Sequence, residues 1–347
     1  MIRFFVVVII PLFVAADIVC PTNGIINAPT NISKPVYFPS DWNENQDAPS
    51  LQPGQKCVWT VTVPRGMYAK LIMKKDVNQV TYVELLDVLG FTYYPTGTLE
   101  PYYFTPFKFS IRATTDNTNN NGGLGFKIQY GYLPSGLNMN YIQVNQSTPI
   151  IKSVTEASNG LAIRSSTTVS VVPIPSTDNS GDRMRSILLF DGVDTNALYI
   201  GNFGMYIDQQ DEIQSSGRVL TIVDLENTNT NDLMVIQDRQ DTRDIINYFG
   251  LVYPSNSNTA AMNLGRGDQK EDVLISVTAN LLTSVDFAVN DPNEGLSVYN
   301  GTISEQNLLF RGNGTSGVKQ QLPKRFGPGL IQYVATQGAM FLRFQKV

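Results

Sequence analysis

The sequence predicts an all-β protein made of consecutive antiparallel β-sandwich modules of the jelly-roll type. Short runs rich in β-branched and aromatic residues recur along the chain, and Pro, Gly, Asn or Asp residues bound them. The clearest runs are KCVWTVTVP (56–64), MYAKLIM (67–73), TYVELLDVLG (81–90), FKFSIRAT (107–114) and LGFKIQYGYLP (124–134). With 42% hydrophobic residues in 347, the chain has room for two or three domains, each with its own core.

The run that follows Cys57 predicts which side of its strand is buried. Side chains alternate between the two faces of a strand, so Trp59, Val61 and Val63 share one face. This face is consistently apolar, whereas the other carries two threonines. We therefore expect Trp59 to pack between two sheets.

The first 16 residues read as a secretory signal peptide. Arg3 precedes an apolar run from Phe4 to Phe13, and the small residues Ala15 and Ala16 follow at the expected cleavage site. The run is too short to span a bilayer, although an N-terminal anchor or a buried strand is the alternative. No later segment offers about 20 consecutive apolar residues, so we expect a soluble extracellular protein without a transmembrane segment.

The cysteine content fits this compartment. Cys20 and Cys57 are the two cysteines of the chain, and in an oxidising environment one disulfide between them is the simplest arrangement. Two free thiols or an intermolecular bond are the alternatives. Each of four Asn-x-Ser/Thr sequons is a candidate site for N-glycosylation. These sequons begin at Asn31, Asn145, Asn300 and Asn313.

Charge and composition argue against several function classes. The net charge is -5, and loss of Arg3 with the signal peptide makes it -6, so we expect no nucleic-acid partner. The absence of histidine excludes Ser-His-Asp and Cys-His catalysis and histidine-bound zinc. Two carboxylate pairs, Asp224 with Glu226 and Glu84 with Asp87, could formally support glycoside hydrolysis. Acidic residues at strand ends are usually only solvated, so we predict neither an enzyme nor a cofactor.

Three features could carry binding. The segment FTYYPTGTLEPYYFTPFKF (91–109) concentrates aromatic residues, and we expect its tyrosines to be exposed and to form a ligand-binding surface. These tyrosines are Tyr93, Tyr94, Tyr102 and Tyr103, whereas Phe91, Phe104, Phe107 and Phe109 are expected to fill the sandwich. The loop DNTNNNGG (116–123) is more simply a solvated turn. The tripeptide Arg266-Gly267-Asp268 resembles an integrin motif but is short enough to arise by chance.

The first third of the chain resembles a CUB domain. The resemblance rests on Cys57-x-Trp59-x-Val61-x-x-Pro64-x-Gly66, then TYVELLD (81–87), then TTDNTNNNGGLGFKIQY (114–130). The lead-in YFPSDWNENQDAPSLQPGQKC (37–57) is similar to the secreted CUB-like proteins of nematodes. The resemblance implies a sandwich that binds other molecules, a role in innate immune or pathogen response, and association with the cell surface or membrane rafts.

One departure from the CUB pattern concerns metal binding. Many CUB domains hold calcium with an acidic residue just before the strand tyrosine, and here that position is Thr81. Asp116 occupies the position of the loop aspartate, and Asp76 is a poorly aligned substitute for a further ligand. Calcium needs six to eight oxygen ligands. We therefore predict no metal site and no calcium-dependent binding.

Two later segments repeat a common unit. ILLFDGVDTNALYIGN (187–202) and LSVYNGTISEQNLLFRGN (296–313) each contain a strand, an Asp/Asn-Gly turn and a second strand that ends in Gly-Asn. We predict a CUB-like domain at 17–135 and degenerate CUB-like domains at 150–250 and 268–347. The polar segments 135–149 and 253–269 read as linkers or long loops. A single large second domain built from two half-repeats is the alternative.

Taken together, the sequence predicts a secreted, glycosylated protein that binds an extracellular protein or glycan. The alternative is a structural or matrix-associated glycoprotein without a specific small ligand. Binding to microbial glycans would favour the first, and tight self-association or co-purification with matrix the second.

Overall fold

A computed structural model describes most of the chain after the predicted signal peptide. The described residues are 18–75, 81–96, 99–117, 122–134, 139–177, 180–209, 211–227, 231–253, 257–264, 271–287, 295–336 and 339–347. The chain forms two compact units, Met1–Glu100 with Phe104–Gly131, and Pro101–Tyr103 with Tyr132–Val347. None of the helices within the described ranges has the length and apolar character needed to cross a membrane.

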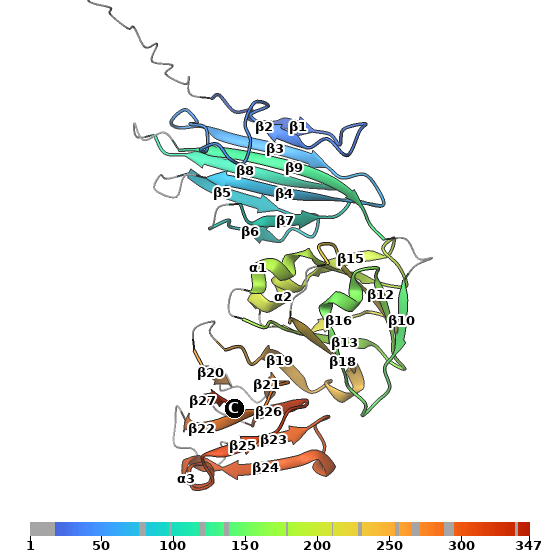
Figure 1. The fold of residues 1–347 in the computed structure, drawn as a ribbon, viewed down its shortest axis with the longest axis vertical. Coiled ribbons are helices and arrows are strands. Elements are labelled where there is room, and N and C mark those ends of the chain that lie inside the picture. The colour runs from blue at the N-terminus through green and yellow to red at the C-terminus, as the bar shows by residue number, and fades with distance from the viewer. Residues whose placement is uncertain are drawn as a thin grey trace, which may run out of the picture. The chain divides into compact units, whose positions relative to one another are not determined.

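The first pair of sheets contains the strands up to residue 132 (Figure 1). One sheet has the order β1-β3-β8-β5-β6 and the other β2-β9-β4-β7. The strands are β1 (Gly24–Ile26), β2 (Val36–Phe38), β3 (Lys56–Thr62), β4 (Met67–Lys75), β5 (Thr81–Leu86), β6 (Thr92–Tyr93), β7 (Pro101–Phe104), β8 (Lys108–Thr115) and β9 (Leu124–Tyr132).

The second pair of sheets has the orders β10-β12-β17-β14-β15 and β11-β18-β13-β16. Its strands are β10 (Asn140–Gln143), β11 (Ile150–Ser153), β12 (Leu161–Arg164), β13 (Val169–Ile174), β14 (Ile187–Asp191), β15 (Leu198–Asn202), β16 (Ile213–Gln214), β17 (Val219–Asp224) and β18 (Leu233–Asp238). Its helices are η2 (Val154–Ala157), α1 (Ser180–Arg183), η3 (Met184–Ser186), α2 (Phe203–Gln209) and η4 (Arg239–Asp241).

The third pair of sheets has the orders β19-β21-β26-β23-β24 and β20-β27-β22-β25. Its strands are β19 (Ile245–Gly250), β20 (Thr259–Leu264), β21 (Glu271–Ser276), β22 (Asn280–Phe287), β23 (Gly295–Asn300), β24 (Leu308–Asn313), β25 (Lys324–Phe326), β26 (Ile331–Thr336) and β27 (Met340–Lys346). Its helices are η5 (Glu305–Asn307) and α3 (Gly314–Lys319).

The three pairs of sheets share one topology. In each, the larger sheet joins the first, third, eighth, fifth and sixth strands of its set, and the smaller sheet joins the second, ninth, fourth and seventh. The first strand pairs in parallel with the third in all three sets. The repeated units of the sequence are the hairpins β14–β15 and β23–β24, which correspond to β5–β6. The predicted fold class of consecutive CUB-like β-sandwich modules is therefore confirmed.

The strands extend beyond two of the predicted domain ranges. The second set begins at Asn140, within the segment 135–149, and the third begins at Ile245 and includes β20, within the segment 253–269. The polar, Gly-, Ser- and Asn-rich composition of both segments predicts linkers or long loops. Short edge strands tolerate such polar residues, since an edge strand has a partner on one side only.

The disulfide and the tryptophan lie in the first unit as predicted. Cys20 and Cys57 are bonded, with their Cα atoms 5.5 Å apart. Trp59 is 2% exposed, and its ring makes edge contacts with Phe38 at 4.7 Å and Phe126 at 5.3 Å between centroids. Those two residues belong to β2 and β9 of the opposite sheet. Trp59 therefore fills the space between the sheets.

Gly125 on β9 is needed for the packing of the second tryptophan. A Cβ at this position would lie 2.6 Å from the ring of Trp42, which is buried. We expect Gly125→Ala to lower the free energy of unfolding of the first unit by about 1–3 kcal/mol, the usual cost of overpacking. Urea unfolding measures this change. Gly217→Ala is the control because nothing lies within 4 Å of that position, and an equal loss there would contradict the packing argument.

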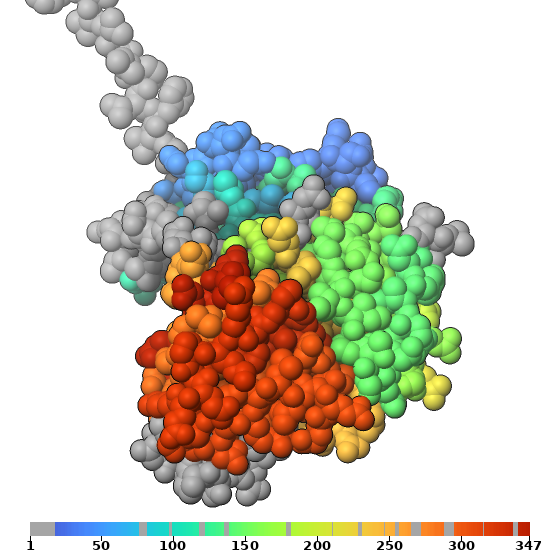
Figure 2. Space-filling view, turned by 60° about the horizontal axis from the view of Figure 1, so that its bottom comes forward, coloured from blue at the N-terminus to red at the C-terminus, as the bar shows by residue number. Residues whose placement is uncertain are grey.

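The second unit contains the second and third pairs of sheets, which share a core. Their surfaces, green and orange to red, lie directly against each other in Figure 2. Each pair also has a core of its own. The shared cluster brings Val172 and Val235 of one pair against Tyr248, Val273 and Val334 of the other. Because these side chains are 2% exposed or less, the two sandwiches bury apolar surface against each other.

Candidate functional site

Two exposed tyrosines lie side by side on the outer face of the first unit. Tyr82 belongs to β5, where Val83 and Leu85 point into the core and Tyr82 and Glu84 point outward. Tyr94 follows β6, the edge strand next to β5. The ring centroids are 5.7 Å apart with an interplanar angle of 40°. The two side chains are 53% and 55% exposed, so both rings are open to a partner.

The electrostatics of the pair favour a neutral Tyr82 side chain. A hydrogen bond with Tyr94 raises the pKa of Tyr82 to about 12, with burial and the Tyr94 and Glu84 charges adding to the effect. Glu84 lies 3.9 Å from Arg112 in the directly opposed register position of β8. The site therefore places an aromatic surface beside a pair of opposite charges.

This arrangement suits recognition of a partner surface. Tyrosine supplies a large amphipathic contact area at low conformational cost and is enriched at the energetic centre of protein interfaces. Aromatic faces also pack on the apolar face of sugar rings. Tyr82 lies on β5 and Tyr94 directly follows β6, and these two strands are paired. Paired strands hold a binding surface more precisely than a free loop does.

Of the four tyrosines predicted to bind a ligand, one is exposed. Tyr93, Tyr102 and Tyr103 are 7%, 2% and 3% exposed, contrary to the expectation that they lie on the surface. Tyr93 is the last residue of β6 and points inward, whereas Tyr94, which follows it in extended chain, points outward. Both faces of β7 are covered at Tyr102 and Tyr103. Tyr94 is therefore the exposed member of the four predicted tyrosines.

The four phenylalanines of the same segment divide differently. Phe104 and Phe109 are buried and stack at 3.8 Å between centroids, and Phe91 is half-buried against Tyr93 at 4.8 Å. Phe107 is 68% exposed, so the expectation that it fills the sandwich is wrong. It lies in the bend just before β8, and its side chain points to solvent.

Tyr82 is the residue that sequence reasoning missed. The run TYVELLD was used for its resemblance to a CUB strand and not for its exposed face. The signal was present in the alternation, because Val83 and Leu85 form an apolar face and leave Tyr82 and Glu84 on the other.

Of the two acidic residues considered for calcium, Asp116 is the one that the structure describes. Asp116 is exposed, and its Oδ1 accepts a hydrogen bond from the Asn117 backbone at 2.6 Å. Asp76 lies outside the described residues, as does most of the loop that follows Asp116. Among the residues that the structure describes, three or more His, Cys, Asp or Glu side chains do not gather into a metal-ligand cluster. The absence of calcium-dependent binding stays a prediction.

The carboxylate pairs considered for glycoside hydrolysis have structural partners. Asp224 is buried and accepts hydrogen bonds from the Ser186 hydroxyl at 3.3 Å and the Glu226 backbone at 3.2 Å. Asp87 is buried and accepts from the backbones of Leu89 and Phe91, at 2.9 and 2.8 Å. Burial raises the pKa of both aspartates. In each case the carboxylate stabilises a turn at the end of a strand.

The remaining predicted sites have these locations. The asparagines of all four sequons are exposed, namely Asn31, Asn145, Asn300 and Asn313. The segment Arg266-Gly267-Asp268 and the predicted signal peptide lie outside the described residues. Exposure makes the four asparagines accessible, and glycosylation stays a prediction.

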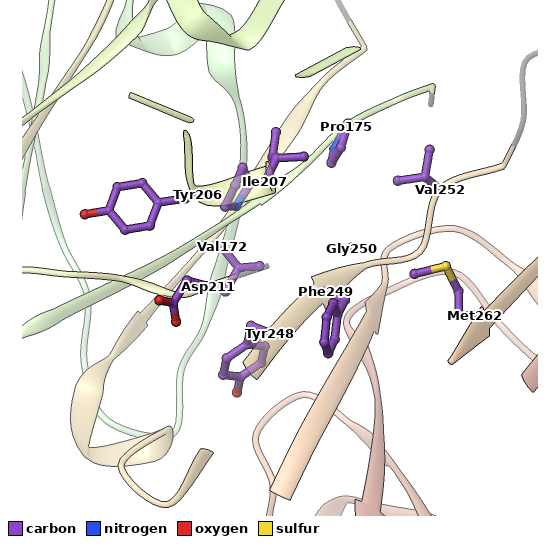
Figure 3. A pocket seen from close by; sticks show the side chains of 11 residues that line it. Val172, Pro175, Tyr206, Ile207, Asp211, Tyr248, Phe249, Gly250, Val252 and Met262 are labelled. Atoms are coloured by element: carbon purple, nitrogen blue, oxygen red, sulfur yellow. The ribbon is translucent and has the colours of Figure 1, made fainter. Parts of the chain in front are cut away.

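The second unit contains a small apolar cavity of about 160 Å³ (Figure 3). Val172, Ile207, Phe249 and Met262 supply apolar walls, and Tyr206 also lines it. The Tyr206 hydroxyl donates to the Ile200 carbonyl at 3.0 Å. Because this hydroxyl is engaged and the walls are largely apolar, the cavity resembles a packing gap between two sandwiches more than a built site.

Comparison with known proteins identifies the first unit. Residues 15–134 match the CUB-like domain family, and residues 141–225 match a domain of unknown function (DUF7592). No curated protein matches the chain. Residues 15–134 therefore form a CUB-like domain, the type of module predicted from Cys57, Trp59 and the strands that follow them.

Solved structures that align with the chain include CUB-containing fragments. The CUB1-EGF-CUB2 domains of rat MASP-1 align at 9% identity over 93% of this chain and 99% of that one, with a TM-score of 0.23. The corresponding human MASP-1/3 fragment aligns at 12% identity over 85% and 94%, with a TM-score of 0.21. The extracellular region of zebrafish Gpr126/Adgrg6 aligns at 10% identity over 91% and 34%, with a TM-score of 0.25. Likeness at these scores does not bear on function.

Proposed function

We propose that the protein is a secreted, non-enzymatic glycoprotein that binds an extracellular partner through the Tyr82–Tyr94 pair of its CUB-like domain. The partner is a protein or a glycan, and the role is recognition in innate immune or pathogen response. Association with the cell surface or membrane rafts follows from the resemblance to the nematode CUB-like proteins.

The observation that carries the proposal is the exposure of two adjacent aromatic rings on a sheet whose opposite face is a packed core. More than half of each tyrosine side chain is accessible although their centroids are 5.7 Å apart. Exposed aromatic residues that lie together mark interaction sites more often than scattered ones do. The disulfide and the four exposed sequon asparagines support an extracellular setting.

The absence of catalysis is part of the proposal. The chain has no histidine, and each carboxylate pair considered for hydrolysis contains a buried aspartate that accepts a hydrogen bond from the backbone of its own turn. A general acid or base must reach the substrate proton within hydrogen-bond distance. One oxygen of Asp87 and of Asp224 is held by a turn and both carboxylates are buried, which supports a binding role.

The test is a binding survey of the purified secreted protein. The probes are bacterial, fungal and host surface glycans and extracellular host proteins, each with calcium and with chelator. Saturable binding to microbial glycans that is equal in both conditions supports the proposal. Tight self-association or co-purification with matrix, without saturable binding to any probe, would instead identify a structural glycoprotein.

A further inference from the structure

A second cavity in the second unit is larger than the apolar one and differs in its chemistry. Its volume is about 520 Å³, within the range of roughly 300–1,000 Å³ that is usual for small-molecule sites. Polar residues from the loop before β18, the loop before β20, the β21–β22 turn and the end of β27 line it, and these include Asn231, Asn258, Thr278 and Lys346. The site lies between the second and third pairs of sheets.

Four of the polar side chains that line the cavity are available to a ligand. Asn231, Asn258, Thr278 and Lys346 are exposed, and their side chains form no hydrogen bond or ion pair with the part of the chain that the structure describes. The described lining residues include no acidic side chain. The cavity therefore combines one positive charge with several neutral groups that both donate and accept hydrogen bonds.

The backbone that carries these groups is held in place. The Lys346 backbone N–H donates to the Asn258 carbonyl at 2.7 Å, which ties β27 to the segment before β20. The Thr278 carbonyl accepts from the Ser276 hydroxyl at 3.0 Å and from the Asn280 side chain at 3.1 Å. A site whose supports are fixed loses less entropy when it binds a ligand.

The alternation of side chains along β27 places Lys346 at the cavity. Leu342 and Phe344 point into the core, and alternation places Lys346 on that same face at the end of the strand. There the sandwich opens, so the apolar row ends in an ammonium group. Tyr253, which is 9% exposed, also lines the cavity and adds an aromatic wall.

We infer that this cavity binds an acidic sugar residue of the uronate type. The carboxylate would pair with Lys346, the ring hydroxyls with Asn231, Asn258 and Thr278, and the apolar face of the sugar with Tyr253. A uronate carries one negative charge among many hydroxyl groups, which matches the one cation and the neutral amides of the cavity. Inorganic phosphate fits these groups less well. The inference does not depend on the Tyr82–Tyr94 surface, which lies in the other unit.

The experiment measures glucuronate binding to the full chain by calorimetry, with glucose and inorganic phosphate as comparison probes. We expect saturable glucuronate binding that Lys346→Met weakens about fivefold, while the weaker binding of glucose is unchanged. Lys108→Met is the matched control, because Lys108 is exposed on β8 of the first unit. It removes the same charge and should leave glucuronate binding unchanged.

Further variants separate this site from the proposed function. Thr278→Val removes one hydroxyl and should weaken glucuronate and glucose alike, whereas Tyr82→Ala with Tyr94→Ala should change neither. Glucuronate binding that is absent, equal in Lys346→Met and Lys108→Met, or displaced as readily by phosphate would overturn the inference.

Discussion

Replacing Trp59 by alanine is expected to lower the free energy of unfolding of the first unit by about 3–5 kcal/mol, the range for removing a large aromatic side chain from a core. The ring is 2% exposed and lies between Phe38 and Phe126 of the opposite sheet. Its strand neighbour Cys57 holds the N-terminal segment through the disulfide. Little of the surrounding structure can collapse into the space that the ring leaves.

Denaturant unfolding of the full chain, followed by near-ultraviolet circular dichroism, measures this loss. Val58→Ala on the same strand is the control, since Val58 is on the outer face and only half-buried. The control should lose less than about 1 kcal/mol. A similarly small loss for Trp59→Ala would contradict the assignment of Trp59 to the core.

Replacing Asp238 by alanine is expected to destabilise the second unit by about 3 kcal/mol or more. The buried carboxylate accepts hydrogen bonds from the Ser165 and Ser166 hydroxyls at 3.1 and 2.5 Å, from the Thr167 hydroxyl, and from the Gln240 backbone at 3.0 Å. These bonds hold the loop between β12 and β13 against the end of β18. Truncation leaves several donors without an acceptor.

The same aspartate predicts how stability depends on pH. Burial alone would raise its pKa, but the hydrogen bonds from Ser166, Thr167 and Gln240 outweigh burial and lower the pKa to about 2 from the usual 3.8. A carboxylate with a lowered pKa in the folded state adds stability above its unfolded pKa, and this stability is lost as the pH falls. The loss for Asp238 lies between about pH 4 and pH 2.

Thermal unfolding of the variant between pH 7 and pH 2 checks both parts. The difference in stability between the native protein and Asp238→Ala should be full at pH 7 and smaller toward pH 2. Asp244→Ala is the control, since that side chain is exposed. A difference that is independent of pH would show that the charge of Asp238 is not what holds the loop.

Much of the fold was predictable because local patterns determined it. Alternation on β3 placed Trp59 in the core, and two cysteines in a predicted oxidising compartment indicated one disulfide. The Asp-Gly and Asn-Gly turns marked the hairpins β14–β15 and β23–β24. The core and hairpin predictions depend on residues that are close in sequence. The disulfide prediction depends on the presence of two cysteines, for which one bond between them is the simplest arrangement.

The candidate site was only partly predictable. Exposure of a tyrosine depends on which face of a strand is covered, and composition does not reveal this. Adjacent residues such as Tyr93 and Tyr94 point to opposite faces, so both could not lie on the outer face of one sheet. The partner ring, Tyr82, comes from β5 and meets Tyr94 only after β5 and β6 have paired.

The measurement that tests the central claim most directly is the affinity of the Tyr82→Ala, Tyr94→Ala double variant for the partner found in the binding survey. Loss of two central aromatic residues should weaken binding by about thirtyfold or more. Tyr141→Ala is the control, because Tyr141 is 67% exposed in the other unit. We predict that the double variant loses binding at an unchanged melting temperature, whereas the control binds normally. Equal affinity of the double variant and the native protein would contradict the account.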